Sequence, residues 1–453
     1  MKRPNVLILY TDQQRWDAVG YSNPLVKTPN IDALAAKGAT LGNTFVNTPV
    51  CMPSRMSMLS GRYPATLGIA CNGIPMPMDI PCLHNILKLY GYRTANLGKL
   101  HFQNHSDHDH RTPHPSYGFD VMINSDEPGC YDDAYIKWVE RKAPEMVDKC
   151  RVSTPPAWEG TPYDVHPRNT DEPYLFEGRE NLTHTAFVGD ETVTFIENSG
   201  SEPFFCIAGF YAPHCPLNPP KRFVDMYNEA EIPLPVRNAG ENFNNHPDSH
   251  WRKVKAYYYA MISQIDEEIG HILNALEKSG KRDNTLIVFT SDHGEYLGDY
   301  GRVQKGGPED SSSHVPLLFN GPGINTGSYD EMTEAIDIAP TILDYCGVQI
   351  PPFIQGQSLL PLFRGQEFKS RNSALIELKH PFKSAYKAVR TRDFLYRAEA
   401  DEEQLFDLRE APYALKNVAG DPEYAETLSE MRREMISRVI GTQSQYPLKE
   451  ASY

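Results

Sequence analysis

Two apolar runs, residues 6–10 and 286–290, of which the second ends in Thr290, limit the folds open to this chain more than any other feature of its sequence. A strand that is apolar at every position has to be covered on both faces, as in the middle of a parallel sheet. Residues 204–209 form another such run, and residues 253–279 carry apolar side chains at helical spacing. We therefore predict an α/β fold in which helices sandwich a large, mixed but mostly parallel sheet.

The pattern changes beyond about residue 366. Short alternating runs separated by turns predict a small antiparallel sheet at 373–378, 387–390, 394–396 and 403–407, with a helix over 424–439 packed against it. We therefore predict an N-terminal α/β catalytic domain over 1–366 and a C-terminal subdomain over 367–453. Further helices are predicted at 28–38, 84–90, 187–198 and 336–343, and further strands at 93–97 and 315–320.

Composition excludes some classes of partner. The formal net charge is −15, which argues against a nucleic-acid partner and against attraction to anionic membranes. Hydrophobic residues make up 40% and charged residues 23%, as in ordinary folded proteins. An anionic substrate therefore requires a local cationic pocket.

The first residues and the cysteines bear on location. The apolar run at 6–10 is too short for a signal sequence or a membrane span, so we expect a cytoplasmic protein, or a periplasmic one if a leader was removed. The eight cysteines show no CxxC spacing, which favours reduced, mostly structural thiols. No pattern predicts the oligomeric state.

Several chemically useful side chains directly follow predicted strands. The carboxyl ends of parallel strands gather at one edge of the sheet, where ligands bind in open α/β folds. A histidine between two prolines after the run at 204–209 is also a rigid site position. Each residue alone is more often a cap, a turn or solvated surface, but together they indicate one site: Asp12 and Gln13, Lys99 and His101, His214, and Asp292 and His293.

Residues 102–182 are rich in His, Asp, Pro and Gly. Four histidines lie close together there, at His105, His108, His110 and His114, and such a tract can bind a metal. We favour a long loop region that shapes the mouth of the pocket, with a helix near 133–141.

The stretch from Cys51 to Arg62 has two interpretations from its residues alone. A cysteine followed by a proline, Arg55 and an apolar run is typical of a thiol at a helix N-terminus, which favours anions. A buried core cysteine is equally compatible. The stretch resembles the signature of the sulfatase family, Cys/Ser-x-Pro-x-Arg followed by Leu-Thr-Gly-Arg, and residues 98–101, 213–216 and 291–295 resemble further sulfatase segments.

This resemblance implies an alkaline-phosphatase-like fold and a separate maturation enzyme that oxidises Cys51 to Cα-formylglycine. It implies hydrolysis of a sulfate monoester of a sugar or of a small organic or aryl alcohol, with one divalent cation, Ca²⁺ first and Mn²⁺ second. The implied cation ligands are Asp12, Gln13, Cys51, Asp292 and His293. The implied catalytic residues are Cys51, Arg55, Lys99, His101, His214 and Lys305.

Two positions differ from the usual family pattern. Many sulfatases have Asp where this chain has Gln13, and Asn where it has His293. The imidazole also suits Mn²⁺, as in the formylglycine-bearing phosphonate monoester hydrolases. A phosphonate monoester or phosphodiester hydrolase is therefore the leading alternative, and an inactive binding protein on the same fold is a third.

Overall fold

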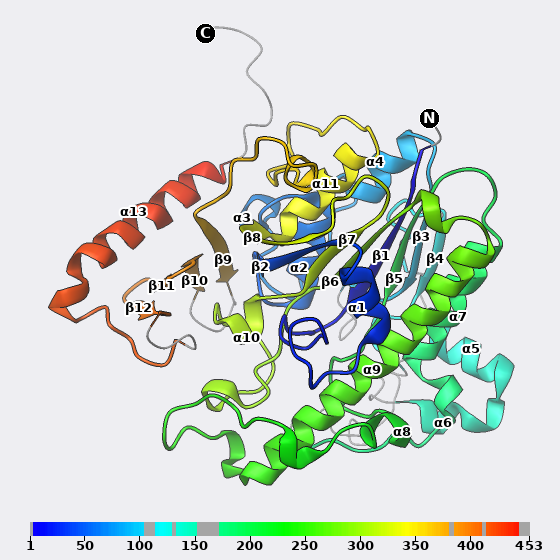
Figure 1. Cartoon of the computed structure of the whole chain (residues 1–453), viewed down its shortest axis with the longest axis horizontal. Helices are drawn as coiled ribbons and strands as arrows, with labels where there is room; N and C mark the ends of the chain where they lie inside the picture. Colours follow the sequence, from blue (N-terminus) through cyan, green and yellow to red (C-terminus); the bar gives the residue numbers. More distant parts are fainter. Residues whose placement is uncertain are drawn as a thin grey trace, which may run out of the picture.

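The computed structural model describes residues 3–103, 114–128, 133–151, 172–379, 385–409 and 414–443. Its centre is an eight-stranded sheet in the order β4-β3-β5-β1-β6-β7-β2-β8 (Figure 1). The strands are β1 (Asn5–Thr11), β2 (Ala39–Phe45), β3 (Arg93–Gly98), β4 (Val121–Asn124), β5 (Phe204–Gly209), β6 (Thr285–Ser291), β7 (Leu317–Asn320) and β8 (Gly327–Glu334).

The sheet is mixed but mostly parallel, which confirms the predicted fold class. β1 pairs in parallel with β5 on one side and with β6 on the other, in the register Val6 to Phe205 and Val6 to Leu286. β7 is antiparallel to its neighbours β6 and β2, and β2 pairs in parallel with β8. The parallel strands β3, β5, β1 and β6 therefore end at one edge.

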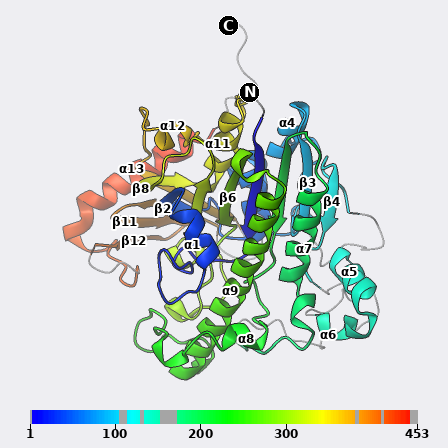
Figure 2. The same cartoon turned by 45° about the vertical axis from the view of Figure 1, so that its right-hand side comes forward.

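Helices cover both faces of this sheet. Leu7 and Leu9 of β1 face a core shared with α7 (His184–Glu197) and α9 (Asp248–Lys278). Val6 and Ile8 face the opposite core, which contains residues of α2 (Cys51–Ser60), α4 (Leu83–Leu89) and α11 (Ile338–Tyr345). Figure 2 shows α7 and α9 lying across one face. This arrangement explains why β1 is apolar from Val6 to Tyr10.

Helix α9 is longer than predicted. It has 31 residues and begins at Asp248, directly after Pro247, rather than at residue 253. A proline just before the first turn and an acidic residue within that turn are both favourable at a helix start. The buried part of α9 includes Tyr258, whose Oη donates to the backbone oxygen of Gln13 at 2.6 Å. The helix therefore also supports the site.

The predicted small sheet is present. It has the order β12-β11-β10-β9 and is antiparallel throughout. One face packs against α13 (Ala425–Gly441) through a separate core that includes Leu375, Val389 and Met431. Its strands are β9 (Ser373–Lys379), β10 (Ala385–Thr391), β11 (Phe394–Ala398) and β12 (Glu403–Asp407). The boundary at residue 366 stays a prediction.

Buried ion pairs join the small sheet and α13 to the large sheet. Glu334, at the end of β8, accepts from Arg438 of α13 at 2.7 Å and from the backbone nitrogen of Leu375 at 2.7 Å. Arg371 donates to Asp337 at 2.7 Å, just beyond β8. The two parts of the molecule therefore share a charged interface as well as apolar contacts.

The remaining elements are mostly short and lie at the periphery. None of the helices in the described part of the chain is long and apolar enough to cross a membrane. The short helices are α1 (Pro29–Ala35), α3 (Pro64–Leu67), α5 (Ala134–Lys142), α6 (Val147–Cys150), α8 (Lys221–Val224), α10 (Asp310–Ser313) and α12 (Leu360–Phe363).

Candidate active site

The site lies where four parallel strands end and helix α2 begins. Because these strands run in one direction, the residues that follow them meet at one edge of the sheet. All ten residues predicted for the site lie at this edge or are linked to it by the contacts described below. Cys51 is the first residue of α2, as the sequence indicated.

Four side chains form a compact cluster that suits a metal ion. One ligand atom from each of Asp12, Cys51, Asp292 and His293 lies within 4.8 Å of the others, and all four residues are buried. His293 Nε2 lies 3.6 Å from an oxygen of Asp12, 3.6 Å from an oxygen of Asp292 and 3.1 Å from Cys51 Sγ. The cluster therefore brings two carboxylates and an imidazole together around one point.

The orientation of His293 fits metal binding. Its Nδ1 lies 2.9 Å from the backbone oxygen of Gly294. A carbonyl oxygen only accepts hydrogen bonds, so Nδ1 carries the proton and Nε2 turns its lone pair toward the cluster. This second hydrogen bond is the usual device that fixes a ligating histidine.

The spacing and the chemistry of these donors fit a divalent cation. Ligands about 2.4 Å from one ion and at right angles to each other lie ~3.4 Å apart, close to the separations around His293 Nε2. Two buried carboxylates near one another repel unless positive charge lies between or beside them. Oxygen donors from Asp12 and Asp292 and one nitrogen from His293 would hold the ion.

Gln13 lies at the rim of this cluster. It adopts a left-handed backbone conformation with φ of 70°, and its backbone nitrogen donates to Asp292 Oδ1 at 2.9 Å. Its side-chain oxygen accepts from Lys305 Nζ at 2.6 Å. Gln13 therefore connects the predicted cation ligands to one of the predicted catalytic lysines.

Arg55 lies beneath the carboxylates and is wholly buried. Its Nε donates to Asp292 Oδ2 at 2.7 Å, its Nη2 is 3.6 Å from Asp12 Oδ2, and its Nη1 donates to the backbone oxygen of Lys99 at 3.0 Å. The guanidinium therefore faces the two carboxylates and ties the ends of β1, β3 and β6 to α2.

Two lysines flank the cluster from opposite sides. Lys99 pairs with Asp12, and its ammonium lies 4.8 Å from the ring centre of Tyr211. Lys305 Nζ lies 3.1 Å from Cys51 Sγ. Burial alone would raise the pKa of the Cys51 thiol, but Lys305, His293 and Lys99 hold that pKa well below its usual value. The position of Cys51 therefore favours a negatively charged group.

The two predicted catalytic histidines also belong to this site. His101, in a left-handed conformation with φ of 57°, hydrogen-bonds the Cys51 side chain. His214 follows β5 and lies between two cis prolines, Pro213 and Pro216. Burial and Lys305 would lower the pKa of His214, but the charges of Cys215 and Asp12 and a hydrogen bond that His214 donates to the Cys215 side chain raise it to about 10. A protonated His214 suits a proton donor.

The structure describes one of the four histidines of the histidine-rich tract. His114 has its Nε2 3.8 Å from Asp126 rather than at the cation cluster. His105, His108 and His110 lie outside the described residues. The helix expected near 133–141 is present as α5.

Residues that the sequence did not single out hold the predicted ones in place. Asp126 Oδ1 accepts from the backbone nitrogens of Leu100 at 2.9 Å and His101 at 2.7 Å. Glu295 accepts from the side chain of Gln13. Both are buried carboxylates with backbone partners. The sequence pointed to Glu295 alone, because it lies within the 291–295 segment that resembles a sulfatase segment.

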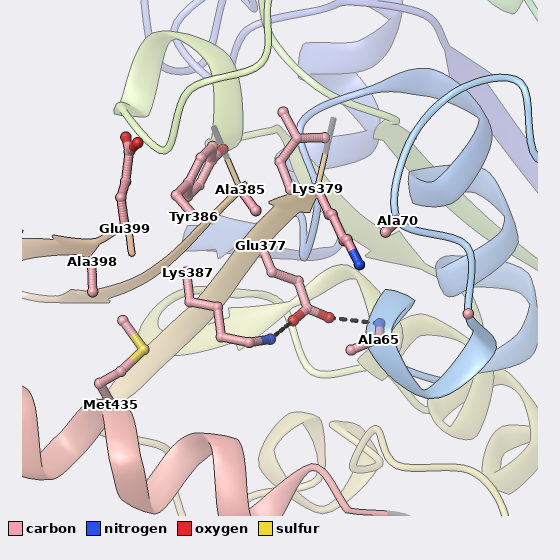
Figure 3. A pocket seen from close by; sticks show the side chains of 12 residues that line it. Ala65, Ala70, Glu377, Lys379, Ala385, Tyr386, Lys387, Ala398, Glu399 and Met435 are labelled. Atoms are coloured by element: carbon pink, nitrogen blue, oxygen red, sulfur yellow. Dashed lines mark hydrogen bonds and ion pairs between the residues drawn. The ribbon is translucent and has the colours of Figure 1, made fainter. Parts of the chain in front are cut away.

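A cavity of about 550 Å³ lies between the small sheet, α3 and α13. Figure 3 shows Glu377 at its centre, paired with Lys387 and accepting from the backbone nitrogen of Ala65 at 2.8 Å. Most of its wall is apolar, and none of the ten site residues lines it. However, the Oη of Tyr386, one of the lining residues, donates to the backbone oxygen of Gly306 at 3.0 Å. The cavity therefore borders the loop that carries Lys305.

Comparison with known proteins identifies the family. The sequence profile of the sulfatase family matches residues 4–348, and the profile of the C-terminal part of N-sulphoglucosamine sulphohydrolase matches residues 298–440. An arylsulfatase of Clostridium perfringens is 30% identical, over 98% of this chain and 96% of the relative. An ulvan-active sulfatase of Formosa agariphila is also 30% identical, over 94% of this chain and 79% of the relative.

Structural comparison agrees with these sequence matches. The crystal structure of a phosphonate monoester hydrolase of Agrobacterium radiobacter superposes with a TM-score of 0.86 at 25% identity, over 99% of this chain and 98% of that one. Because the sulfatase profile covers most of the sequence and the arylsulfatase aligns along almost all of it, this chain belongs to the sulfatase family of the alkaline phosphatase superfamily and is a sulfuric ester hydrolase.

Proposed function

We propose that the protein hydrolyses the sulfate monoester of a small organic or aryl alcohol, or of a sugar, after a separate maturation enzyme has oxidised Cys51 to Cα-formylglycine. The position of Cys51 is the observation that carries the proposal. Cys51 is the first residue of α2. Its sulfur lies 3.1 Å from both His293 Nε2 and Lys305 Nζ and belongs to the same cluster as Asp12 and Asp292. The hydrated aldehyde supplies one hydroxyl to attack sulfur and a second whose deprotonation expels sulfate.

The residues around Cys51 divide the remaining tasks. Asp292 accepts the proton of the attacking hydroxyl, and Lys99, Lys305 and Arg55 stabilise negative charge that develops at sulfur and at the nucleophile. His214 or Lys305 donates a proton to the leaving alcohol oxygen. His101, hydrogen-bonded to the Cys51 side chain, takes the proton that is lost when sulfate leaves.

One divalent cation belongs to this proposal. A cation held by Asp12, Gln13, Asp292 and His293 would lower the pKa of a hydroxyl on the modified Cys51. The family resemblance gives Ca²⁺ as the expected ion, while the His293 imidazole gives Mn²⁺ as the alternative. Elemental analysis of the purified protein, followed by titration of the metal-free protein with each ion, distinguishes them.

The cavity beside Lys305 supports an aryl or other largely apolar alcohol portion for the ester. Its volume lies within the range of small-molecule sites, which are mostly apolar with a few polar groups. Tyr386 joins its wall to Gly306, next to Lys305. We place the organic portion of the ester in this cavity because the loop that carries Lys305 contacts both the cavity wall and Cys51.

A phosphonate monoester or phosphodiester hydrolase is the second candidate. The Agrobacterium radiobacter structure favours it, because the superposition covers 98% of that phosphonate monoester hydrolase. Gln13 and His293 are proposed cation ligands that are not carboxylates, so the site carries less negative charge than one in which carboxylates took their places.

Two measurements test the proposal together. Mass spectrometry of the peptide that contains Cys51, from protein co-expressed with a maturation enzyme, should find formylglycine. The kcat/KM for 4-nitrophenyl sulfate should exceed the kcat/KM for an aryl phosphonate monoester. The opposite order would select the phosphonate hydrolase, and unmodified Cys51 in fully active protein would contradict the proposed nucleophile.

A further inference from the structure

Glu295 is a buried carboxylate that receives three N–H donors. It follows the cation-site residues Asp292 and His293 and is only 2% exposed. Its Oε1 accepts from the backbone nitrogens of Leu297, at 3.2 Å, and Gln304. Its Oε2 accepts from Nε2 of Gln13. One side chain therefore contacts the end of β1 and the loop that leads into Lys305.

The other end of the Gln13 amide meets a donor. Gln13 Oε1 accepts from Lys305 Nζ at 2.6 Å, and the same Nζ lies 3.1 Å from Cys51 Sγ. An ammonium group has no acceptor, and an ionised carboxylate has no donor. The amide therefore lies between a pure donor and a pure acceptor.

Only one orientation of the amide satisfies both neighbours. If it turned by half a rotation about its last side-chain bond, its NH₂ would face the ammonium of Lys305 and its oxygen would face the carboxylate of Glu295. Both contacts would be repulsive. The contact with Glu295 is buried and the contact with Lys305 is partly buried, and unpaired polar groups in such an environment are costly. Glu295 thus determines which amide atom faces Lys305.

We propose that Glu295 is a positioning residue of the cation site, whose carboxylate orients the Gln13 amide so that Oε1 points toward Lys305 and the cation. This inference rests on the proposed cation site. It adds that the site depends on a residue that does not itself ligate the ion.

Replacing the carboxylate by an amide reverses this arrangement. In Glu295→Gln, the introduced oxygen is held by the two backbone donors of Leu297 and Gln304, because they are fixed in the loop. The introduced NH₂ then faces Gln13. Gln13 has to offer it an oxygen, so its own NH₂ turns toward Lys305 and the cation.

The reciprocal substitution repairs the contact. In Gln13→Glu combined with Glu295→Gln, the introduced carboxylate accepts from the introduced amide and presents its second oxygen to Lys305 and the cation. The pair exchanges one carboxylate and one amide, so the net charge is that of the wild type.

The test is a double-mutant cycle of Mn²⁺ affinity in the metal-free, full-length protein, measured from free Mn²⁺ by electron paramagnetic resonance. Glu295→Gln should weaken Mn²⁺ binding by about 10-fold or more when residue 13 is Gln, as for loss of other supporting contacts at metal sites. The same substitution should cost nothing in the Gln13→Glu background. Comparing the effect of Glu295→Gln between the two backgrounds cancels the direct effect that the charge added at residue 13 has on Mn²⁺ affinity.

A matched control separates orientation from loop stability. Glu309→Gln also removes a buried carboxylate from this region. In the wild type, this carboxylate accepts from Tyr296 at 2.6 Å and from Arg302 at 3.1 Å. It has no hydrogen bond to Gln13 or Lys305 among the described contacts, so it should leave Mn²⁺ affinity within about twofold of the wild type.

The outcomes are distinct. Equal weakening by Glu295→Gln in both backgrounds, or no weakening in either, overturns the positioning role while the cation site stands. A wild type that binds neither Mn²⁺ nor Ca²⁺, the latter measured by calorimetry, overturns the cation site and this inference with it; if it binds only Ca²⁺, the same cycle is measured with Ca²⁺. If Glu295→Gln alone fails to fold, the double variant decides. A double variant that folds and binds Mn²⁺ at least as tightly as Gln13→Glu supports the positioning role. A double variant that fails to fold, or that binds Mn²⁺ more weakly than Gln13→Glu, overturns it.

Discussion

The ammonium group of Lys305 lies 3.1 Å from the sulfur of Cys51. Burial would lower the pKa of Lys305, but the charges of Cys51, Asp12 and Asp292 raise that pKa above its ordinary value. The lysine therefore stays protonated at neutral pH. It brings fixed positive charge to the place where the nucleophile and the sulfuryl group meet.

Lys305→Met should lower kcat by about 100-fold or more, because preorganised charge at a reacting centre contributes on that scale. The fold should persist, since the methionine can occupy the space of the lysine side chain. Steady-state kinetics with 4-nitrophenyl sulfate measures the effect. Lys221→Met removes a surface lysine that pairs with Asp225; if both variants lose kcat equally, Lys305 has no special role.

Cys51→Ala should abolish turnover while the protein stays folded. Cys51 is 2% exposed, and removing one sulfur from a packed position costs about 1 kcal/mol of unfolding free energy. Sulfate-ester assays and a thermal melt of the same sample measure the two effects. Normal hydrolysis by Cys51→Ala would contradict the proposed nucleophile.

The central strands and the site were predictable for one reason. β1 and β6 are buried along their whole length and apolar over most of it because both faces of the sheet are covered, and the residues just after such strands meet at one edge. Strands farther from the centre of the sheet carry no such signal. β8 is polar and half-exposed over its first five residues, and β2 contains Gly42 with an irregular register between Leu41 and Asn43, so neither was predicted.

The supporting carboxylates were not predictable by spacing. Asp126 lies 25 residues from His101, and Glu295 lies 282 residues from Gln13. Their partners are backbone nitrogens of loops or a distant amide, and no periodicity links such positions. Only the folded chain shows that Asp126 holds the left-handed conformation of His101.

Ala70→Trp should discriminate between substrates by size. Ala70 lines the cavity beside the Lys305 loop, and a tryptophan there would occupy part of its volume. The KM for a bulky aryl sulfate should rise by about 10-fold, the cost of losing roughly 1.4 kcal/mol of apolar contact, with little change for methyl sulfate. Ala36→Trp, at a separate groove, is the control. An unchanged KM for the bulky ester would place its organic portion elsewhere.

Acid should destabilise the protein through His84. Burial lowers the pKa of His84 to about 4, although its hydrogen bond with the backbone oxygen of Tyr117, at 2.8 Å, opposes the shift. The neutral form is favoured in the folded state, so its stabilising contribution is complete above the unfolded pKa of about 6.5 and is lost as pH falls toward 4. A shift of this size corresponds to about 3 kcal/mol.

Urea unfolding of the wild type and of His84→Gln between pH 7 and pH 4 measures this contribution. The glutamine does not titrate and retains an N–H donor for Tyr117. Its unfolding free energy should therefore fall less steeply with acidification. Parallel pH curves for the two proteins would show that His84 does not protonate on unfolding.

Arg438→Met should destabilise the junction between α13 and the large sheet. Arg438 donates to the fully buried Glu334 at 2.7 Å. Burial raises the pKa of Glu334, but Arg438 and Arg371 hold it below its ordinary value, so the carboxylate is charged at neutral pH. Removing one partner of a buried pair costs about 3 kcal/mol.

Arg432→Met provides the matched control on the same helix. Arg432 pairs with Glu403 at the surface, where both side chains are substantially exposed, and such pairs contribute little to stability because solvent screens them. Urea unfolding at pH 7 should therefore show a much larger loss for Arg438→Met. The difference should shrink below about pH 4, because protonation of Glu334 removes the charge that Arg438 compensates. Similar losses for the two variants at pH 7 would mean that the junction depends on its apolar contacts rather than on this ion pair.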